Sequence, residues 1–264
     1  LFVGEEISFA SRYRVEHFRE QLHYQGYGSD FYQVDEVEDL DWDAYRAVVC
    51  YRCSREDVVR KVVEQAKKTG LNVYYDIDDL IFDYERISYL HFLTGSEYKD
   101  FKKTTEQIHS CMELCDGYFT STDTLGGEIR REFPGKPVVI NRNCASMEMQ
   151  ILSHDAVEQV EKDSEHISIG YFSGSKTHDQ DFEVAEEALL EVMKEHSEVR
   201  LKLGGVLSDR KMEKFGNKVE KLPFMDWKQL PSVMAGIDIN LMPLEDSIFH
   251  CSKSENKWME AALV

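Results

Sequence analysis

Three carboxylates stand together directly after a short apolar run. Asp76, Asp78 and Asp79 follow residues 71–75, whose composition predicts a strand. Carboxylates repel one another when they are crowded at a strand end. Such a group suits recognition of hydroxyls, general-base catalysis or binding of a divalent cation. Aspartate also commonly forms the turn that follows a strand, and this interpretation stays equally open.

A loop of small residues follows a second predicted strand, at 167–172. It contains Ser173, Gly174, Ser175 and Lys176, and a helix is predicted to begin soon after it. Backbone N–H groups in such a loop can approach a phosphate, with help from the hydroxyls and the ammonium. The loop lacks the dinucleotide-binding and Walker glycine patterns. A simple turn is the competing interpretation.

A basic segment near the end of the chain is the third candidate. Ser252 with Glu255 three residues later has the pattern of a capping box, which predicts the start of a helix. The helix N-terminus would face an anion at the carboxyl end of the preceding strand. Lys253 and Lys257 would face the same anion, and Glu260 would accept hydrogen bonds from sugar hydroxyls. An amphipathic surface helix with ion pairs is the alternative.

The remaining patterns are weaker. Arg12 and Arg14 would meet an anionic group, or would be solvated. Cys50 and Cys53 have redox or metal spacing, but no second CxxC pair follows, so we interpret the cysteines as reduced thiols of a cytosolic protein. None of the nine histidines falls in an HxxxH metal pattern, and no GxSxG nucleophile elbow is present.

Alternating strands and helices must position these residues. The apolar periodicity predicts helices at 11–26, 55–68, 99–114 and 125–133 and strands at 47–50, 71–75, 117–121 and 137–140. After an acidic stretch the alternation restarts, with strands at 167–172, 199–203, 219–222 and 237–242 and helices at 182–196, at 227–235 and from 255 onward. This order is typical of parallel sheets covered by helices. We therefore expect an α/β protein with two Rossmann-like domains facing across a cleft, at 1–147 and 166–264, joined by an acidic linker at 148–165 that is either irregular or partly helical.

Composition limits the class of protein. The chain has 264 residues, of which 42% are apolar, and 31 basic against 50 acidic residues give a net charge of −19. This charge repels phosphate backbones, so nucleic acid is not an expected partner. No apolar run approaches the ~20 residues of a membrane helix. The chain begins at Leu1 and stops at Val264 inside an apolar helix, so we expect the second domain to be incomplete.

The ordered series of segments resembles the retaining GT-B-fold glycosyltransferases of family 4 and its relatives, which build glycogen, mannan and O-antigen. The likeness covers nearly the whole chain. No single motif in it is as specific as a zinc signature, but the ordered series is. Its donor-domain part consists of residues 169–175, 199–205, 219–224, 230–238 and the helix that carries Glu260, and its N-terminal part of residues 115–122 and 140–143.

The resemblance implies transfer of a sugar from a UDP- or GDP-sugar to a glycan or lipid-linked acceptor, with retention and without metal or cofactor. Glu260 matches the glutamate that binds the ribose. Ser254, Lys257 and Glu260 match a Ser-Pro-x-Lys-x-x-Glu pattern of one subgroup except at the proline. Positive charge from Lys176, Lys253 or Lys257 would stabilise the leaving diphosphate.

The sequence also departs from the family. Ser252 stands where an acidic residue often faces the donor sugar, the first loop lacks the usual arginine, and Asp78-Asp79 replaces a histidine followed by aspartate. The implied roles are catalysis for Asp78 and Lys257, acceptor binding for Arg12, Arg14, Asp76 and Asp79, and donor binding for Ser173, Gly174, Ser175, Lys176, Phe224, Ser252, Lys253, Ser254, Lys257 and Glu260.

Two other classes of function stay open. A catalytically inactive GT-B-like module would only sense a nucleotide or glycan, and the departures at Ser252 and in the first loop favour it. A sugar-nucleotide epimerase of GT-B type would make its product from the donor alone. The expected location is the cytoplasm, and a lipid-linked acceptor would bring the protein to the inner face of a membrane as a peripheral protein.

Overall fold

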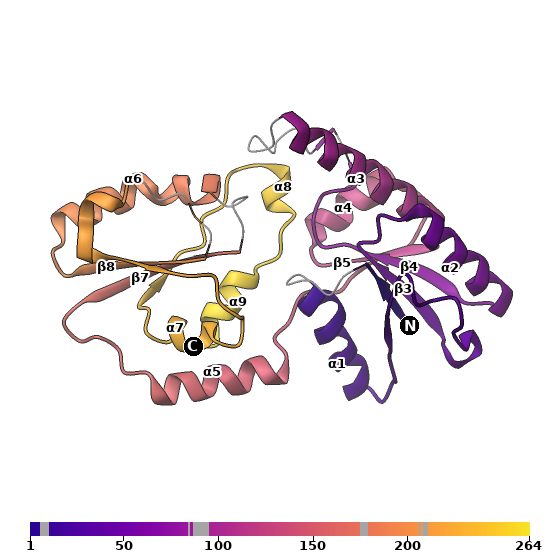
Figure 1. The fold of residues 1–264 in the computed structure, drawn as a ribbon, viewed down its shortest axis with the longest axis horizontal. Helices are drawn as coiled ribbons and strands as arrows, with labels where there is room; N and C mark the ends of the chain where they lie inside the picture. Colours follow the sequence, from indigo (N-terminus) through magenta and orange to yellow (C-terminus); the bar gives the residue numbers. More distant parts are fainter. Residues whose placement is uncertain (6–10, 84, 87–94, 175–178, 206, 208–210) are drawn as a thin grey trace. The chain divides into compact units, whose positions relative to one another are not determined.

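The computed structural model describes residues 1–264 except 6–10, 84, 87–94, 175–178, 206 and 208–210. The chain forms two compact units. Unit 1 comprises Leu1–Cys144 and Ser247–Ser254, and unit 2 comprises Ala145–Asp246 and Glu255–Val264. Each unit is built on one parallel sheet covered by helices (Figure 1), which confirms the predicted α/β class.

Unit 1 contains a six-stranded parallel sheet in the order β2-β1-β3-β4-β5-β6. The strands are β1 (Phe2–Gly4), β2 (Phe31–Gln33), β3 (Ala47–Tyr51), β4 (Asn72–Asp76), β5 (Gly117–Thr120) and β6 (Val138–Ile140). In the register, Tyr51 lies beside Asp76, and Asp76 lies beside Phe119. The carboxyl ends of β3, β4 and β5 therefore lie together along one edge, called the carboxyl edge of unit 1 below. Strands β1 and β2 were not predicted from the sequence.

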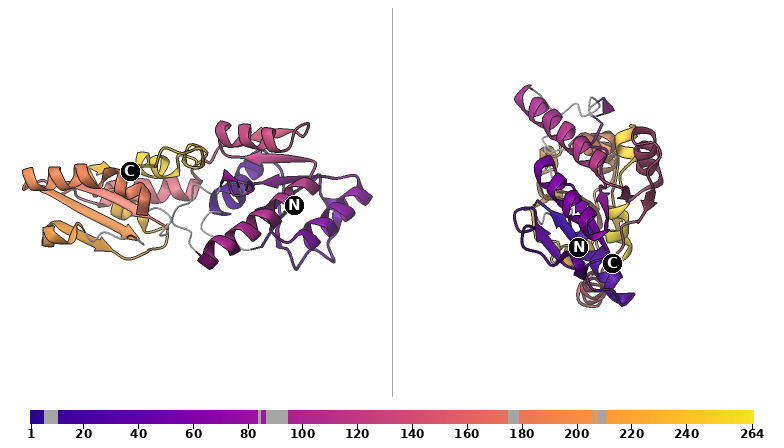
Figure 2. Two further views of the ribbon diagram at one scale, coloured as in Figure 1. Left: turned by 90° about the horizontal axis from the view of Figure 1, so that it is seen from above. Right: turned by 90° about the vertical axis from the view of Figure 1, so that its right-hand side faces the viewer.

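Helices cover both faces of this sheet. They are the π-helical turn η1 (Arg12–Glu16), α1 (His17–Tyr24), the 3-10 turn η2 (Trp42–Ala44), α2 (Glu56–Thr69), α3 (Gly95–Leu114), α4 (Asp123–Glu132) and α8 (Ile248–Cys251). Helix α1 packs Phe18 and Leu22 against Phe2 and Val49 on one face. Helices α2, α3 and α4 contribute to the larger core on the other face, where α2 and α3 lie side by side (Figures 1 and 2).

Helix α2 shows how local sequence fixes these elements. Its inner side carries Val58, Val59, Val62, Val63 and Ala66, all buried at helical spacing. The helix ends at Gly70, whose φ of 71° is the left-handed conformation that glycine accepts without a steric cost.

Unit 2 contains a four-stranded parallel sheet in the order β10-β7-β8-β9. Its elements are α5 (Met147–Gln159), β7 (Ile167–Ser173), α6 (Asp179–Glu195), β8 (Val199–Gly205), the 3-10 segment η5 (Glu213–Lys218), β9 (Val219–Leu222), α7 (Leu230–Met234), β10 (Ile239–Asn240) and α9 (Asn256–Ala262). Helix α6 covers one face of the sheet, and α5, α7 and α9 lie on the other (Figure 1). Leu189 and Met193 of α6 pack against Leu201 of β8 in the core.

Two segments differ from their sequence-based interpretation. Most of the expected acidic linker is helix α5, which begins at a Ser146 cap, where the hydroxyl accepts from the N–H of Met149, and which packs against α7 of unit 2. Residues Ser247–Ser254 belong to unit 1, although the sequence groups them with the second domain. Phe249 anchors them, because it is buried in the larger core of unit 1.

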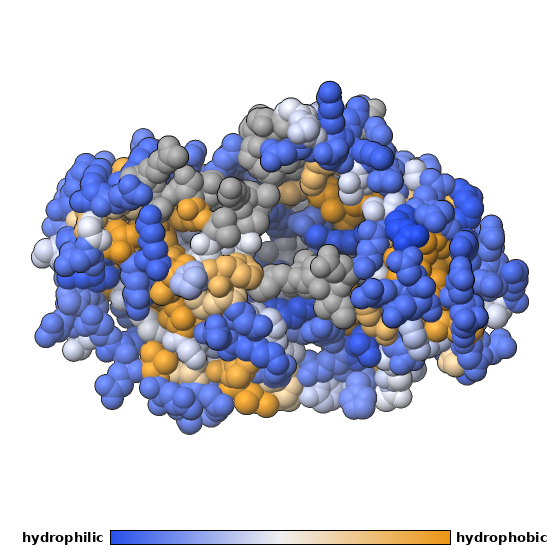
Figure 3. Space-filling view, in the orientation of Figure 1, coloured by the Kyte–Doolittle hydropathy of each residue, from blue (hydrophilic) through white to orange (hydrophobic). Residues whose placement is uncertain are grey.

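The molecular surface is dominated by polar side chains. The face shown in Figure 3 is mostly hydrophilic, as expected from 31% charged residues. Within the part of the chain that the structure describes, we find no helix with the length and apolarity needed to cross a bilayer.

Candidate functional site

A buried ion pair lies beneath the carboxyl edge of unit 1. The π-helical turn η1 carries Arg14 into the protein, and π-helical turns of this kind often occur at functional sites. Its Nε and Nη2 atoms donate to the two carboxylate oxygens of Asp76, each at 2.8 Å. Its Nη1 atom donates to the carbonyl of Asn141 at 2.5 Å and to Oδ1 of Asn143 at 2.9 Å. Arg14 thus ties η1 to the ends of β4 and β6.

Arg52 forms a second charge cluster at the same edge. It directly follows β3, and its Nε donates to Oδ1 of Asp78 at 2.8 Å while its Nη2 donates to Asp79. Its φ is +46°, and no other described residue besides glycine has a positive φ. This left-handed conformation costs a non-glycine residue about 1–2 kcal/mol. The backbone N–H of Arg52 offsets part of the cost by donating to the carbonyl of Asp76 at 3.1 Å.

Burial and these arginines act in opposite directions on the carboxylates. Burial raises the pKa of Asp78, and Arg52 counteracts the rise. Burial alone would lower the pKa of Arg52, but its attraction to Asp78 and Asp79 raises that pKa well above the ordinary value, so the guanidinium stays charged. The edge therefore contains a partly buried carboxylate beside a fixed positive charge.

Three hydroxyl groups at this edge have no hydrogen-bond partner among the described residues. They belong to Tyr51, Thr120 and Ser121, all of which are buried. Buried hydroxyls are nearly always hydrogen-bonded, and exceptions are found where a ligand or water completes the set. The end of β5 thus adds polar groups that sequence analysis did not single out.

The structure separates the residues that were predicted to bind an acceptor. Arg14 and Asp76 are fully buried and paired with each other, so in this arrangement neither can contact an acceptor. Arg12 is also buried, and its Nη2 donates to the hydroxyl of Tyr13. Asp79 retains 31% exposure of its side chain and Asp78 only 9%. The carboxylates were correctly expected at a strand end, but Asp76 is buried and forms an internal ion pair with Arg14.

Arg52 was not among the residues predicted from the sequence. It lies between the two cysteines of the CxxC pattern, which drew attention to the thiols. The available signal was its position: Arg52 follows a predicted strand, just as Asp76 does, and parallel strands place such residues at one edge.

At the carboxyl edge of unit 2, the backbone is closely packed. Ser173 ends β7 and is buried, whereas Gly174 after it is exposed. Gly205 ends β8 with a φ of +90°, and a Cβ atom there would lie 1.9 Å from the carbonyl oxygen of Ser173. Only glycine fits this position. The two strand ends thus run in close contact. Ser175 and Lys176, the rest of the predicted loop, lie outside the described residues.

Helix α9 carries the predicted donor-binding side chains of unit 2. The ammonium of Lys257 lies 4.5 Å from the ring centroid of Tyr171, near the end of β7, a geometry suited to a cation–π contact. Glu260 is half-buried one turn further along the same helix. Phe224, expected beside the base, is 55% exposed.

The predicted capping box is wrong. Helix α9 begins at Asn256, and its start has no side-chain cap. Ser252 instead ends α8, and its buried hydroxyl donates to the carbonyl of Ile248 at 2.7 Å. The cause is Thr122, which donates to the carbonyl of Ser252 at 2.8 Å and fixes this segment to unit 1.

The same correction separates the two lysines. Lys253 and Lys257 do not share a helix, and they belong to different units. The ammonium of Lys253 lies over the ring of Phe249 in unit 1, at 5.0 Å. Ser254 likewise accepts a hydrogen bond from Asn143 of unit 1.

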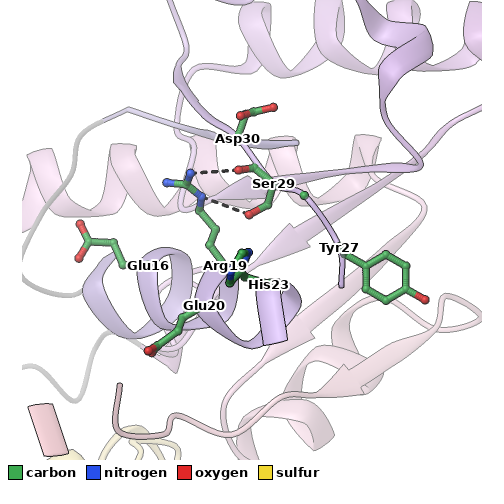
Figure 4. A pocket seen from close by; sticks show the side chains of 8 residues that line it. Glu16, Arg19, Glu20, His23, Tyr27, Ser29 and Asp30 are labelled. Atoms are coloured by element: carbon green, nitrogen blue, oxygen red, sulfur yellow. Dashed lines mark hydrogen bonds between the residues drawn. The ribbon is translucent and has the colours of Figure 1, made fainter. Parts of the chain in front are cut away.

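A surface pocket of about 520 Å³ lies elsewhere on unit 1. It is lined by the last residue of η1, by residues of α1 and by the segment before β2: Glu16, Arg19, Glu20, His23, Tyr27, Gly28, Ser29 and Asp30. Arg19 is bound to Ser29, and Tyr27 points away from the other side chains (Figure 4). Asp30 precedes β2, so this pocket lies at the amino edge of the sheet. It is therefore not where an open parallel sheet binds its ligand.

The described residues offer no ready metal centre. They contain no group of three or more histidine, cysteine or acidic side chains arranged to hold a metal ion. All six cysteines are free, and Cys50, Cys53, Cys111 and Cys115 are buried. Burial raises the pKa of Cys111 to about 12, which keeps it a thiol.

Comparison with known proteins relates this architecture to solved structures. No family model matches the sequence, and no curated protein matches it. An alpha-glucosyltransferase in complex with UDP-glucose and DNA containing an abasic site is similar, with a TM-score of 0.63, 10% identity, and 99% of this chain and 76% of that chain covered. WaaG, a glycosyltransferase involved in lipopolysaccharide biosynthesis, is similar with a TM-score of 0.57 and 14% identity, and the match covers 99% of this chain and 78% of that chain. Alr3699/HepE of Anabaena, in complex with UDP, is similar with a TM-score of 0.54 and 11% identity, and the match covers 90% of this chain and 72% of that chain.

The chain has a GT-B fold. The evidence is the pair of parallel sheets in two α/β units, together with these three structures, which align over 90–99% of the chain. At 10–14% identity the likeness concerns the fold. In a GT-B fold, the two carboxyl edges described above are the places where side chains can act on ligands.

Proposed function

We propose that this protein is a glycosyltransferase that moves a sugar from a UDP-sugar donor. The observation that supports this most is the GT-B fold shared with three structures, of which two contain UDP or UDP-glucose and two are glycosyltransferases. The strand ends of unit 2 add to it, because Ser173 and Gly205 bring the backbones of β7 and β8 together at the carboxyl edge, where backbone N–H groups can approach a phosphate.

In this proposal, helix α9 binds the donor. Glu260 accepts hydrogen bonds from the ribose hydroxyls, and Lys257 neutralises the diphosphate. The two side chains lie three residues apart on one helix, so they project from the same side. As the sugar leaves, the diphosphate gains negative charge, and a fixed ammonium stabilises that charge without a metal ion.

In this proposal, the carboxyl edge of unit 1 acts on the acceptor, a glycan or a lipid-linked saccharide, and the reaction proceeds with retention. Asp78 and the more exposed Asp79 receive the acceptor hydroxyls. The neighbouring guanidinium of Arg52 already neutralises one of these two carboxylate charges, which disfavours a divalent cation there.

Calorimetric titration of UDP, GDP and uridine into the protein tests the donor site. Glu260→Ala should weaken UDP binding by roughly one to three orders of magnitude, because a charged acceptor contributes about 1.5–3 kcal/mol per hydrogen bond. Lys257→Met should weaken UDP more than uridine. Lys162→Met is the matched control, since Lys162 donates to the carbonyl of Ile237 ahead of β10, at the amino edge of the same sheet. Unchanged UDP affinity in both α9 variants would place the donor elsewhere.

Turnover separates the proposal from its rivals. Incubation with UDP-sugars, with and without saccharide acceptors, should give acceptor-dependent release of UDP that EDTA leaves unchanged. Binding of UDP without any transfer or donor hydrolysis would instead indicate an inactive nucleotide-binding module. A new nucleotide sugar formed without acceptor would indicate an epimerase.

A further inference from the structure

Arg52 combines two features that are seldom found together. It has a left-handed backbone although it is not glycine, and its side chain forks onto two carboxylates of the next loop. An ion pair alone does not require this backbone, because an arginine in extended conformation can also reach a neighbouring strand. Residues held in such conformations cluster at functional sites, where the surrounding structure maintains them.

The charges around Asp78 show what the two carboxylate contacts of the Arg52 guanidinium achieve. Asp78 is faced by Arg52 and Tyr51 from the end of β3, by Arg14 from η1, by Asp76 from β4 and by Asp79 from its own loop. Arg14 is held by Asp76 in a two-oxygen pair. Arg52 is therefore the cation that directly contacts Asp78, with Nη2 at 2.7 Å and Nε at 2.8 Å from Oδ1.

We propose that Arg52 is a positioning residue whose left-handed backbone and guanidinium hold Asp78 in place as a carboxylate, the form that accepts a hydroxyl in the transfer proposed above. The inference rests on that proposed function for its purpose. Arg52 itself acts through Asp78 and needs no contact with substrate.

The test uses variants that separate backbone from charge. Arg52→Gly keeps the backbone, because glycine adopts a positive φ freely, and removes the guanidinium. Arg52→Lys keeps one positive charge but loses the planar fork. Arg55→Gln is the matched control, since Arg55 pairs with Asp35 on the surface three residues further along the chain.

The first readout is the carboxyl carbon signal of Asp78, followed by NMR as a function of pH in the whole protein without substrate. Arg52→Gly should raise the midpoint of this titration by at least about one pH unit, a tenfold change in proton affinity. The midpoint of Arg52→Lys should lie between those of wild type and Arg52→Gly, and the midpoint of Arg55→Gln should equal that of wild type. The acidic limb of the pH–rate profile for sugar transfer should move by the same amount, while UDP affinity stays constant.

An Asp78 midpoint that is identical in wild type and Arg52→Gly would overturn the inference, and a lowered melting temperature alone would then show a purely structural ion pair. The carboxyl titration decides this without substrate. A wild-type protein that turns over no donor would instead overturn the proposed function, so the two failures are distinguishable.

Discussion

The carboxyl edges of the two sheets are built by opposite means. In unit 1 the edge is formed by charged side chains that are buried and paired, such as Arg14 with Asp76 and Arg52 with Asp78. In unit 2 the edge is formed by backbone, where Gly205 lies against the carbonyl of Ser173. The first arrangement fixes the position and charge of a few polar groups. The second fixes two strand ends at backbone contact distance.

This difference predicts how each unit tolerates substitution. Loss of a charge partner in unit 1 leaves its counterpart buried and unneutralised, so the cost is electrostatic. Addition of a single methyl group in unit 2 forces two strand ends apart, so the cost is steric. The three tryptophans allow the units to be followed separately, because Trp42 lies in unit 1 while Trp227 and Trp258 lie in unit 2.

The largest effect is expected for Arg14→Met. This change removes the guanidinium and leaves Asp76 buried, and broken pairs of this kind cost about 3–5 kcal/mol. The measurement is urea unfolding followed by Trp42 fluorescence, in a background where Trp227 and Trp258 are replaced by phenylalanine. Arg60→Met is the control, because Arg60 forms an exposed pair with Glu56 that contributes about 0.3–0.5 kcal/mol. Equal losses in the two variants would show that the buried network is not special.

A smaller effect is expected in unit 2 for Gly205→Ala. The new Cβ atom meets the carbonyl of Ser173, and alanine disfavours the positive φ, so the two effects together should cost about 2–4 kcal/mol. Gly174→Ala is the control, since a Cβ atom there has no neighbour within 4 Å. Unfolding followed through Trp227 and Trp258 should report the loss, and UDP affinity should fall in parallel. A fully stable Gly205→Ala protein would mean that the strand ends separate easily.

The sequence was sufficient to predict most of the helices and the central strands. Hydrophobic periodicity predicted the central strands of both sheets and helices such as α2, because buried valines at regular spacing leave a clear pattern. The short elements β1 and β2 were not predicted, and tertiary contacts define their limits.

The candidate site was less predictable, because its geometry depends on long-range contacts. Nothing in the local sequence shows that Ser252 is bound by Thr122, a residue 130 positions away, and this contact is what displaces the expected capping box. The pairing of Arg14 with Asp76 spans 62 positions for the same reason. The types of the polar residues at strand ends were visible in the sequence, and their partners were not.

The smallest expected effect concerns pH and again distinguishes the units. His17 of unit 1 is buried, and its Nδ1 lies 2.7 Å from the carbonyl of Cys144, the last residue of the first segment of unit 1. Burial lowers its pKa below the ordinary value of 6.5. His154 of unit 2 is 71% exposed and serves as the matched control.

The sign follows from proton binding. When the folded pKa lies below the unfolded value, the unfolded state binds the proton more readily, so acid favours unfolding. The stability contributed by neutral His17 is fully present above pH 6.5, is lost as the pH falls from 6.5 to the lowered pKa, and does not change further below it. Each unit by which the pKa is lowered corresponds to about 1.4 kcal/mol.

His17→Asn keeps an N–H donor for Cys144 and removes the titration. The free energy of unfolding of wild type minus that of His17→Asn should therefore decrease between about pH 8 and about pH 5, and by more than the corresponding difference for the exposed His154→Asn. Loss of the Tyr13–His17 ring contact, at 5.0 Å, adds a constant offset that does not depend on pH and so leaves the slope intact. A flat difference for His17→Asn would mean that the folded protein accommodates the imidazolium, and that the polar network of unit 1 is more hydrated than its burial indicates.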